Sequence, residues 1–224
     1  MYRFVLAAVI AFGFSAETLA DDFRLLRLDD HFVKWGERSW HSGARITYSF
    51  NRTTRDFADA INCPRLVPVD GLLARSGISK PDFERAIRRA FRTWERAANL
   101  RFEFVEDADA ADIVIGAQGI PRDIAYTNVW HGSAEPGRIA SFTKTVFCLN
   151  PEIAWENALD GDDQTYDVER VATHEIGHAI GLDHPGPSGA LMGYRYTESV
   201  HGLAPGDIEG ARRLYGPPRR ESQD

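Results

Sequence analysis

The amino-acid sequence predicts an α+β domain in which three helices pack on a twisted, mixed sheet of five strands. Apolar residues recur at helical spacing over residues 83–98, whereas polar and apolar residues alternate over 45–50 and 100–104. The order strand, helix, strand then implies a parallel pair of strands joined by a right-handed crossover.

The boundaries of the other elements follow from capping residues, breakers and apolar runs. Ser79 is expected to cap the first helix and Asp167 the second, while Pro205 and Gly216 bound the third. Proline and glycine mark 51–79 as an irregular excursion, and 119–137 also reads as a loop. The expected strands are 45–50, 100–104, 112–116, 138–142 and 145–149, and the expected helices end near residues 98, 180 and 215.

Length and composition fit one ordinary globular domain. The chain has 224 residues, of which 43% are hydrophobic and 26% are charged. This composition argues against disorder, a coiled coil or a fibre. Because the formal net charge is −7, we expect no nucleic-acid partner.

Residues 1–20 have the layout of a secretory signal peptide. Arg3 precedes an uncharged apolar run over residues 4–14, and small residues place a cleavage site after Ala20. The run is shorter than the roughly 20 residues that a membrane-spanning helix needs, and an uncleaved anchor is the alternative. With no later candidate span, the mature chain is expected to start near Asp21 and to be secreted, either to the periplasm or to the extracellular medium.

The two cysteines, Cys63 and Cys148, suit an exported protein. A disulfide between them would close a long loop and contribute roughly 4 kcal/mol in the chain-entropy model. The alternative is two unrelated buried thiols, but one pair behind an export signal favours the bridge.

A metal-binding pattern begins at His174 and reads His-Glu-Ile-Gly-His-Ala-Ile-Gly-Leu-Asp-His. His174 and His178 are four residues apart, so on a helix both imidazoles face the same side and can reach one Zn²⁺ ion. Gly181 allows a sharp turn that returns His184 as a third ligand. A fourth position left for water is typical of a catalytic zinc, and Glu175 is placed to act as general base.

The alternative interpretation is three histidines whose hydrogen bonds are satisfied within a core helix. It would require burial of the Glu175 carboxylate without any purpose, which is rare for an unpaired acid. The complete spacing, with Gly181 and His184 added to the first three positions, is also expected by chance in only about one chain in 10⁵. The pattern therefore favours a metal site.

With the Ala-Leu-Met-Gly-Tyr segment at 190–194, the extended motif resembles the metzincin metallopeptidases of the matrixin and serralysin branch. In that group a methionine in a tight turn lies beneath the metal, and Met192 fits that position. Tyr194 matches a serralysin tyrosine that approaches the zinc, so it is a candidate fifth ligand or transition-state donor, or else packs the pocket wall. The resemblance covers most of the chain from Trp35 onward and implies a metzincin catalytic domain with an active-site cleft.

Three departures from that branch stand out. The chain lacks the calcium-binding glycine-rich repeats of serralysins, and we expect no matrixin-like pro-domain with its cysteine switch. Ser141 and Cys148 stand where similar segments of matrixins place histidines for a structural zinc. The sequence thus predicts one catalytic Zn²⁺ ion and leaves structural zinc or calcium open.

The resemblance implies a secreted zinc endopeptidase divided into a signal peptide (1–20), a catalytic domain (21–216) and a flexible tail (217–224). A peptide or protein substrate would bind in extended conformation along an exposed strand edge, which we place at 138–142. The alternatives are a zinc-loaded peptide-binding module that has lost turnover and a structural protein stapled by zinc. Retention of Glu175 argues against the first, and the presence of only three protein ligands argues against the second.

Overall fold

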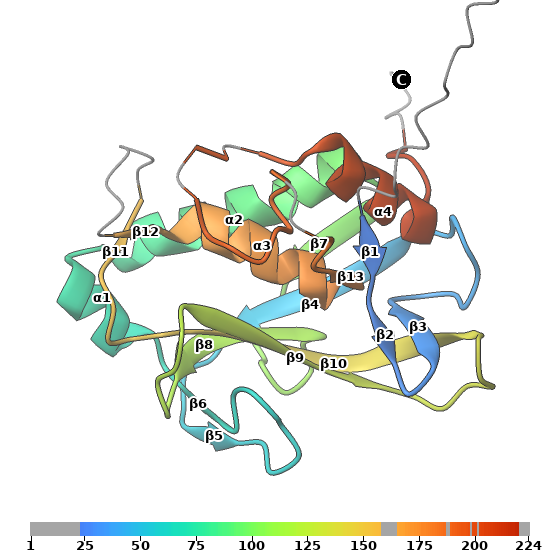
Figure 1. Ribbon diagram of the computed structural model, residues 1–224. Coiled ribbons are helices and arrows are strands. Elements are labelled where there is room, and N and C mark those ends of the chain that lie inside the picture. The colour runs from blue at the N-terminus through green and yellow to red at the C-terminus, as the bar shows by residue number, and fades with distance from the viewer. Residues whose placement is uncertain (1–22, 158–164, 187–188, 198, 201, 220–224) are drawn as a thin grey trace, which may run out of the picture.

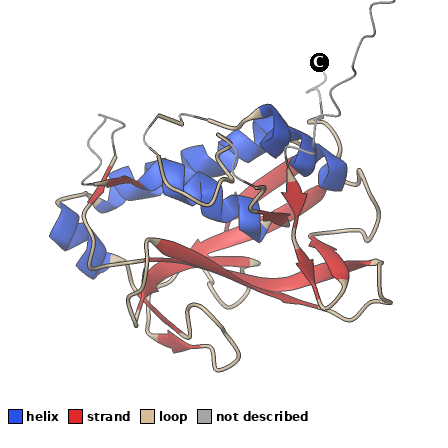
Figure 2. Cartoon of the chain, viewed as in Figure 1, coloured by secondary structure: helices blue, strands red, loops and turns tan. Residues whose placement is uncertain are grey.

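The computed structural model describes residues 23–157, 165–186, 189–197, 199–200 and 202–219. The expected signal peptide and residues 220–224 of the expected tail lie outside this part of the chain. Helices α2 (Lys80–Ala97), α3 (Val168–Ala179) and α4 (Pro205–Tyr215) lie together on one side of a twisted sheet, as Figures 1 and 2 show. No helix in the described ranges combines the length and the apolar character needed to cross a bilayer.

The principal sheet is mixed, which confirms the predicted fold class. Its strands run in the order β2-β3-β10-β8-β4-β7, and β5, β6 and β9 join at its margins. The strands are β1 (Arg24–Leu25), β2 (Arg27–Leu28), β3 (His31–Lys34), β4 (Ala44–Phe50), β5 (Arg55–Asp56), β6 (Arg65–Val67), β7 (Leu100–Phe104), β8 (Ile113–Gln118), β9 (Ala125–His131), β10 (Ile139–Leu149), β11 (Trp155–Glu156), β12 (Tyr166–Asp167) and β13 (Leu182–Asp183). The helices are α1 (Asp70–Ser76), α2 (Lys80–Ala97), α3 (Val168–Ala179) and α4 (Pro205–Tyr215).

The predicted crossover joins β4 to β7 through α2. The two strands are parallel, with Ala44 opposite Leu100. At the start of α2, the Ser79 hydroxyl accepts a hydrogen bond from the main-chain N–H of Asp82 at 3.2 Å, which satisfies one of the free N–H groups of the first turn. The apolar stripe of this helix is buried, as its spacing predicts.

Helices α2 and α3 are locked together through Trp94. Its side chain is fully buried, and the indole Nε1 donates to the main-chain oxygen of Thr173 at 2.8 Å. Asp167 caps α3 by accepting from the N–H of Arg170 at 2.6 Å, as expected. Helix α3, which carries His174 and His178 and is called the zinc-motif helix below, is therefore fixed at its first turn and along its buried face.

Two predictions about the sheet are wrong. The segments 138–142 and 145–149 form one strand, β10, whose pairing with β9 shifts register between Phe142 and Lys144. That irregularity breaks the alternation, so the sequence reads as two strands. The expected loop at 119–137 contains β9, whose side chains are mostly half-buried on both faces and therefore show no clean alternation.

The excursion at 51–79 is more ordered than its composition indicates. Strands β5 and β6 form a hairpin, and Leu66 of β6 pairs with Gln118 of β8. The short helix α1 follows and ends at Gly77, which has a positive φ of 66°. The described chain thus holds four helices instead of the three expected, because α1 is too short to show a periodic stripe.

The predicted disulfide between Cys63 and Cys148 is present. It ties the β5–β6 hairpin to β10. Figure 1 shows this hairpin on the side of the sheet opposite to the helices. A small apolar cluster surrounds the bridge there, formed by Cys63, Leu66, Val114, Val146 and Cys148 with other small residues.

Candidate metal centre and active-site cleft

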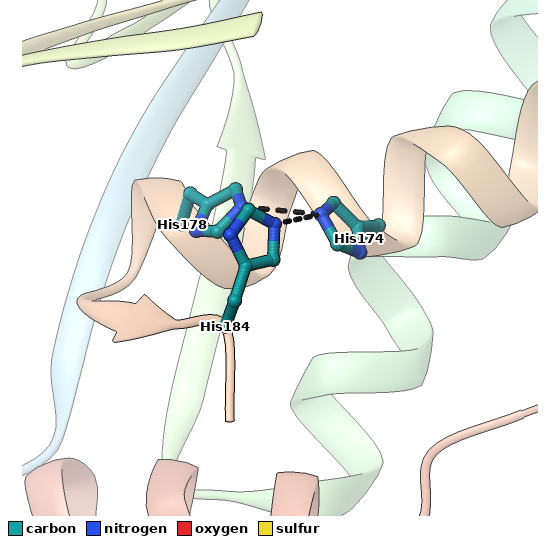
Figure 3. A group of neighbouring side chains, drawn as sticks. All are labelled: His174, His178 and His184. Atoms are coloured by element: carbon teal, nitrogen blue, oxygen red, sulfur yellow. Dashed lines mark hydrogen bonds between the residues drawn. The ribbon is translucent and has the colours of Figure 1, made fainter. Parts of the chain in front are cut away.

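Three histidine side chains converge beside the C-terminal half of α3. His174 and His178 lie one turn apart on this helix, and His184 approaches them from the segment after β13 (Figure 3). The Nε2 atom of His174 lies 3.1 Å from each of the other two Nε2 atoms, which are 3.2 Å apart. Within the described ranges, this is the one group of histidine, cysteine or acidic side chains with metal-ligand spacing.

Hydrogen bonds to the main chain fix the tautomer of two of these rings. The Nδ1 atom of His174 lies 2.8 Å from the carbonyl oxygen of Leu191, and that of His178 lies 2.9 Å from the carbonyl oxygen of Leu182. Because a carbonyl oxygen can only accept, Nδ1 must carry the proton in both rings. Each Nε2 atom therefore directs a lone pair into the cluster.

This donor set fits a tetrahedral metal ion. Bonds of about 2.0–2.1 Å at tetrahedral angles place ligand nitrogens about 3.3 Å apart, close to the observed spacing. The Nε2 atoms of His174 and His178 both carry lone pairs and cannot hydrogen-bond each other, so their 3.1 Å contact (Figure 3) is one that a cation between them would stabilise. Burial lowers the pKa of all three rings, that of His178 to about 4, which keeps the imidazoles neutral as ligands must be.

The turn that carries His184 depends on Gly181 and on the N-terminal segment. Gly181 has a φ of 101°, and a Cβ atom there would lie 2.2 Å from the main-chain oxygen of Val33. Strand β1 pairs with β13, and the Arg24 side chain lies 2.9 Å from the Asp183 carboxylate. Asp183 also accepts from the main-chain N–H of His184 at 2.8 Å, so the turn is held from both sides.

Glu175 lies next to the histidine cluster and is almost fully buried. Its carboxylate Oε2 accepts a hydrogen bond from the Thr127 hydroxyl of β9 at 2.7 Å. Burial raises the pKa of Glu175 to about 7, and the hydrogen bond from Thr127 opposes that rise. Both side chains line the cleft described below, so the carboxylate is available to a bound molecule.

The turn at Met192 packs directly under the zinc-motif helix. A Cβ atom on Gly177 would lie 2.2 Å from the Met192 sulfur, so only glycine allows this approach. The buried carboxylate of Asp207 accepts from the N–H groups of Leu191 and Met192 at 2.9 and 3.2 Å. It also accepts from Ala204 N–H at 2.8 Å, so one side chain fixes both the turn and the start of α4.

Tyr194 lies at the mouth of the site. Its ring contacts that of His184 edge to face, with centroids 5.0 Å apart, and the residue is 82% exposed. Tyr194 is among the residues that line the cleft described below, at its solvent-exposed rim.

A cleft with a volume of about 790 Å³ runs past the histidines. One side is formed by α3 and the segment after β13, and the other by β9, from which Ala125 to Trp130 all line the cleft. Among the described strands, β9 pairs only with β10 and so keeps one free edge. The prediction that 138–142 is the exposed edge is wrong, because these residues in β10 pair with β3 on one side and meet β9 on the other.

Ser141 and Cys148 have partners other than a metal. Cys148 is bonded to Cys63. The Ser141 hydroxyl donates to the Gly36 carbonyl at 3.2 Å and accepts from Arg38 Nε at 3.3 Å. Neither side chain is free to act as a ligand of a structural zinc.

Thr127 and Asp207 are two residues of the site that sequence reasoning missed. Asp207 could have been found, since an acid two residues after Pro205 fits the first turn of a helix. Thr127 gives no local signal, because its role depends on β9 lying beside α3.

Comparison with known proteins shows which family this chain resembles. A family model described as Matrixin matches residues 73–216. The chain is 30% identical over 154 residues to Matrix metalloproteinase-16 of Mus musculus, covering 63% of this chain and 25% of that protein. It is 33% identical over 148 residues to Interstitial collagenase of Sus scrofa, covering 62% and 29%. It is 30% identical over 149 residues to Metalloendoproteinase 1-MMP of Arabidopsis thaliana, covering 62% and 40%. The chain thus spans between a quarter and two fifths of the length of these relatives.

Proposed function

Because this chain belongs to the matrixin family, we propose that it is a secreted zinc-dependent endopeptidase. The observation that supports this most strongly is the convergence of three Nε2 atoms at 3.1–3.2 Å, with a buried carboxylate beside them. In the proposal, His174, His178 and His184 hold the ion and Glu175 is the general base.

The chemistry needs both a Lewis acid and a proton acceptor. A zinc ion held by the three histidines supplies Lewis-acid activation of water and of a carbonyl oxygen. Glu175 takes the proton of the attacking water and delivers it to the leaving amine. Its pKa of about 7 suits both steps near neutral pH, because a group that takes and then gives a proton works best when its pKa lies near the working pH.

Thr127 keeps the Glu175 carboxylate aimed into the cleft. A buried carboxylate without a donor would turn towards any available N–H or water, so the 2.7 Å hydrogen bond fixes one oxygen and leaves the other for the substrate water. Since Thr127 belongs to β9, this hydrogen bond fixes the position of the Glu175 carboxylate relative to the strand that lines the cleft.

We assign to Tyr194 the role of a transition-state donor rather than a permanent ligand. Its phenol stands beside His184 and is largely solvent-exposed, so the side chain has room to move. Because only the three histidines would hold the ion, a donor that approaches only when negative charge develops on the substrate would leave room there for water.

The substrate in this proposal is an extended peptide that adds a strand to the free edge of β9. The unpaired N–H and C=O groups of that edge would pair with the peptide main chain. This mode sets the register of the substrate beside Glu175 and places successive side chains on opposite sides of the peptide.

Secretion is supported by two separate features. Residues 1–20 carry the signal-peptide pattern, and Cys63 and Cys148 form a disulfide, a bond that persists in oxidising compartments.

The proposed activity is tested by incubating the purified chain from Asp21 with a mixed peptide library, with and without a zinc chelator. Cleavage that stops with the chelator and returns with added Zn²⁺ is the expected result. A folded, zinc-loaded sample that binds peptides without cleaving them would favour the alternative of a peptide-binding module. A sample that does neither would favour zinc as a structural staple.

A further inference from the structure

Successive side chains of β9 point to opposite faces of the sheet. Thr127 reaches Glu175 on the helix-covered face. On the other face, Asn128 accepts from the main-chain N–H of Asn62 at 3.1 Å, and the Trp130 ring packs on Phe57 with centroids 5.6 Å apart. A peptide paired with β9 would show the same alternation, with every second side chain turned away from the histidines.

The cleft extends around the free edge of β9 to that second face. Besides the histidines and Glu175, its lining includes residues 59–62 of the loop between β5 and β6. Figure 1 shows this loop on the side of β9 opposite to the helices. One continuous groove therefore faces both sets of side chains of a bound peptide.

The loop at 57–63 is braced rather than loose. The disulfide Cys63–Cys148 holds its end. Asn128 donates to the Cys63 carbonyl at 3.3 Å, and Arg122 donates to the Asn62 carbonyl at 3.1 Å. A loop with these ties can present a side chain at a fixed place, which limits the entropy lost when a ligand binds.

Ile61 is the side chain that this loop presents. It is 86% exposed and lines the groove, as do the aromatic side chains of Trp130 and Tyr126 of β9. A single exposed aliphatic residue is common on protein surfaces. An exposed aliphatic residue on a braced loop at the rim of a substrate groove is placed to make a hydrophobic contact with an apolar side chain of the substrate.

We propose that Ile61, Trp130 and Tyr126 form a second specificity subsite, the outer subsite, for an aliphatic or aromatic side chain of the substrate. This inference rests on the proposed peptidase function. The outer subsite receives the residues immediately before or after the one whose side chain points towards the histidines. The enzyme therefore selects peptides in which an apolar residue neighbours that inward-pointing residue.

The test uses the whole mature chain and matched fluorogenic peptides that differ only at an outward-pointing position, with Leu, Ser or Glu there. Ile61→Ser should lower the ratio of kcat/KM for the Leu peptide over the Ser peptide by about threefold to tenfold, as loss of a modest apolar contact predicts. Ile61→Lys should move the preference towards the Glu peptide. Ile120→Ser is the matched control, because Ile120 is also exposed (51%) but does not line the groove.

The outcomes separate the subsite from the activity itself. Chelator-sensitive cleavage with a changed ratio in the two Ile61 variants, and an unchanged ratio in the Ile120 control, supports the outer subsite. Chelator-sensitive cleavage with the same ratio in all four proteins overturns the subsite while the peptidase proposal stands. Absence of cleavage by the wild type overturns the peptidase proposal, and the subsite fails with it.

Discussion

The two sides of the cleft are held together in different ways. The helix wall, formed by α3, the turn through His184 and the turn at Met192, is built mainly from described residues between 167 and 207, with β1 as a distant support. The strand wall, formed by β9 and the loop at 57–63, joins segments that are more than 60 residues apart through the Cys63–Cys148 bridge and Asn128.

This difference places the proposed chemistry in the helix wall and the proposed substrate selection in the strand wall. In the helix wall, main-chain oxygens orient His174 and His178, and Asp207 binds the main chain of the Met192 turn, so the metal-binding atoms depend on local backbone geometry. In the strand wall, a covalent bridge and side-chain hydrogen bonds position the groove rim. We therefore expect changes in the helix wall to abolish turnover and changes in the strand wall to alter stability and selectivity.

The largest effect is expected from removal of a metal ligand. His184→Ala leaves two imidazoles for the ion, so bound zinc should be lost under mild chelation and peptide cleavage should disappear with it. Zinc content by elemental analysis, before and after dialysis against chelator, measures this. His41→Asn serves as the control, because His41 is exposed and its φ of 60° is one that asparagine tolerates. Stoichiometric zinc in the His184 variant would remove this residue from the metal site.

The next effect separates the proposed general base, Glu175, from the proposed metal site. Glu175→Gln keeps the size of the side chain and an oxygen for Thr127, so zinc content should stay at that of the wild type. Turnover should fall by about 10³- to 10⁴-fold, since proton transfer by a positioned group contributes on that order. Single-turnover kinetics on zinc-loaded protein measure the loss, and a rate near that of the wild type would exclude Glu175 from proton transfer.

The strand wall is tested through its covalent tie. The double variant Cys63→Ala, Cys148→Ala removes a bridge between residues separated by 85 positions. The chain-entropy model gives a loss of about 4–5 kcal/mol in the free energy of unfolding, measured by urea titration. Zinc content of the folded fraction should not change, because the bridge lies on the other wall. A variant that loses zinc while keeping its stability would contradict the separation of the two walls.

The smallest effect on turnover is expected at the contact between the two walls, the hydrogen bond from Thr127 to Glu175. Thr127→Val keeps the shape of the side chain but removes the donor to Glu175, and kcat should fall by about tenfold with little change in KM, as loss of one hydrogen bond to a charged group predicts. Thr127→Ser restores the hydroxyl and should restore kcat. Equal rates for the Val and Ser variants would show that the contact is only structural.

The sequence predicted the helix wall well because its signals are local. The spacing from His174 to His184 places the imidazoles once the helix and the Gly181 turn are assumed, and the structure brings all three together. The caps at Ser79 and Asp167 and the parallel crossover were also readable, since each depends on neighbouring residues or on element order.

The strand wall could not be predicted in the same way. Strand β9 is half-buried on both faces, so polar and apolar residues mix without a period of two, and its position depends on pairing with β10. The irregularity at Phe142–Lys144 further hid β10 as one strand. Only the cysteine pair gave a long-range signal, and it correctly connected the excursion at 51–79 with the sheet.

The pairing of β1 with β13 couples the first described strand to the proposed metal centre. Arg24 and Leu25 lie opposite Asp183 and Leu182, and His184 follows immediately. A bulky affinity tag or fusion partner joined directly ahead of Phe23 would strain this two-stranded clasp, and the strain would reach a metal ligand within two residues. For production and immobilisation of this protein, the attachment point of choice is therefore behind α4, beyond Pro217, because that segment takes no part in the pairing of β1 with β13.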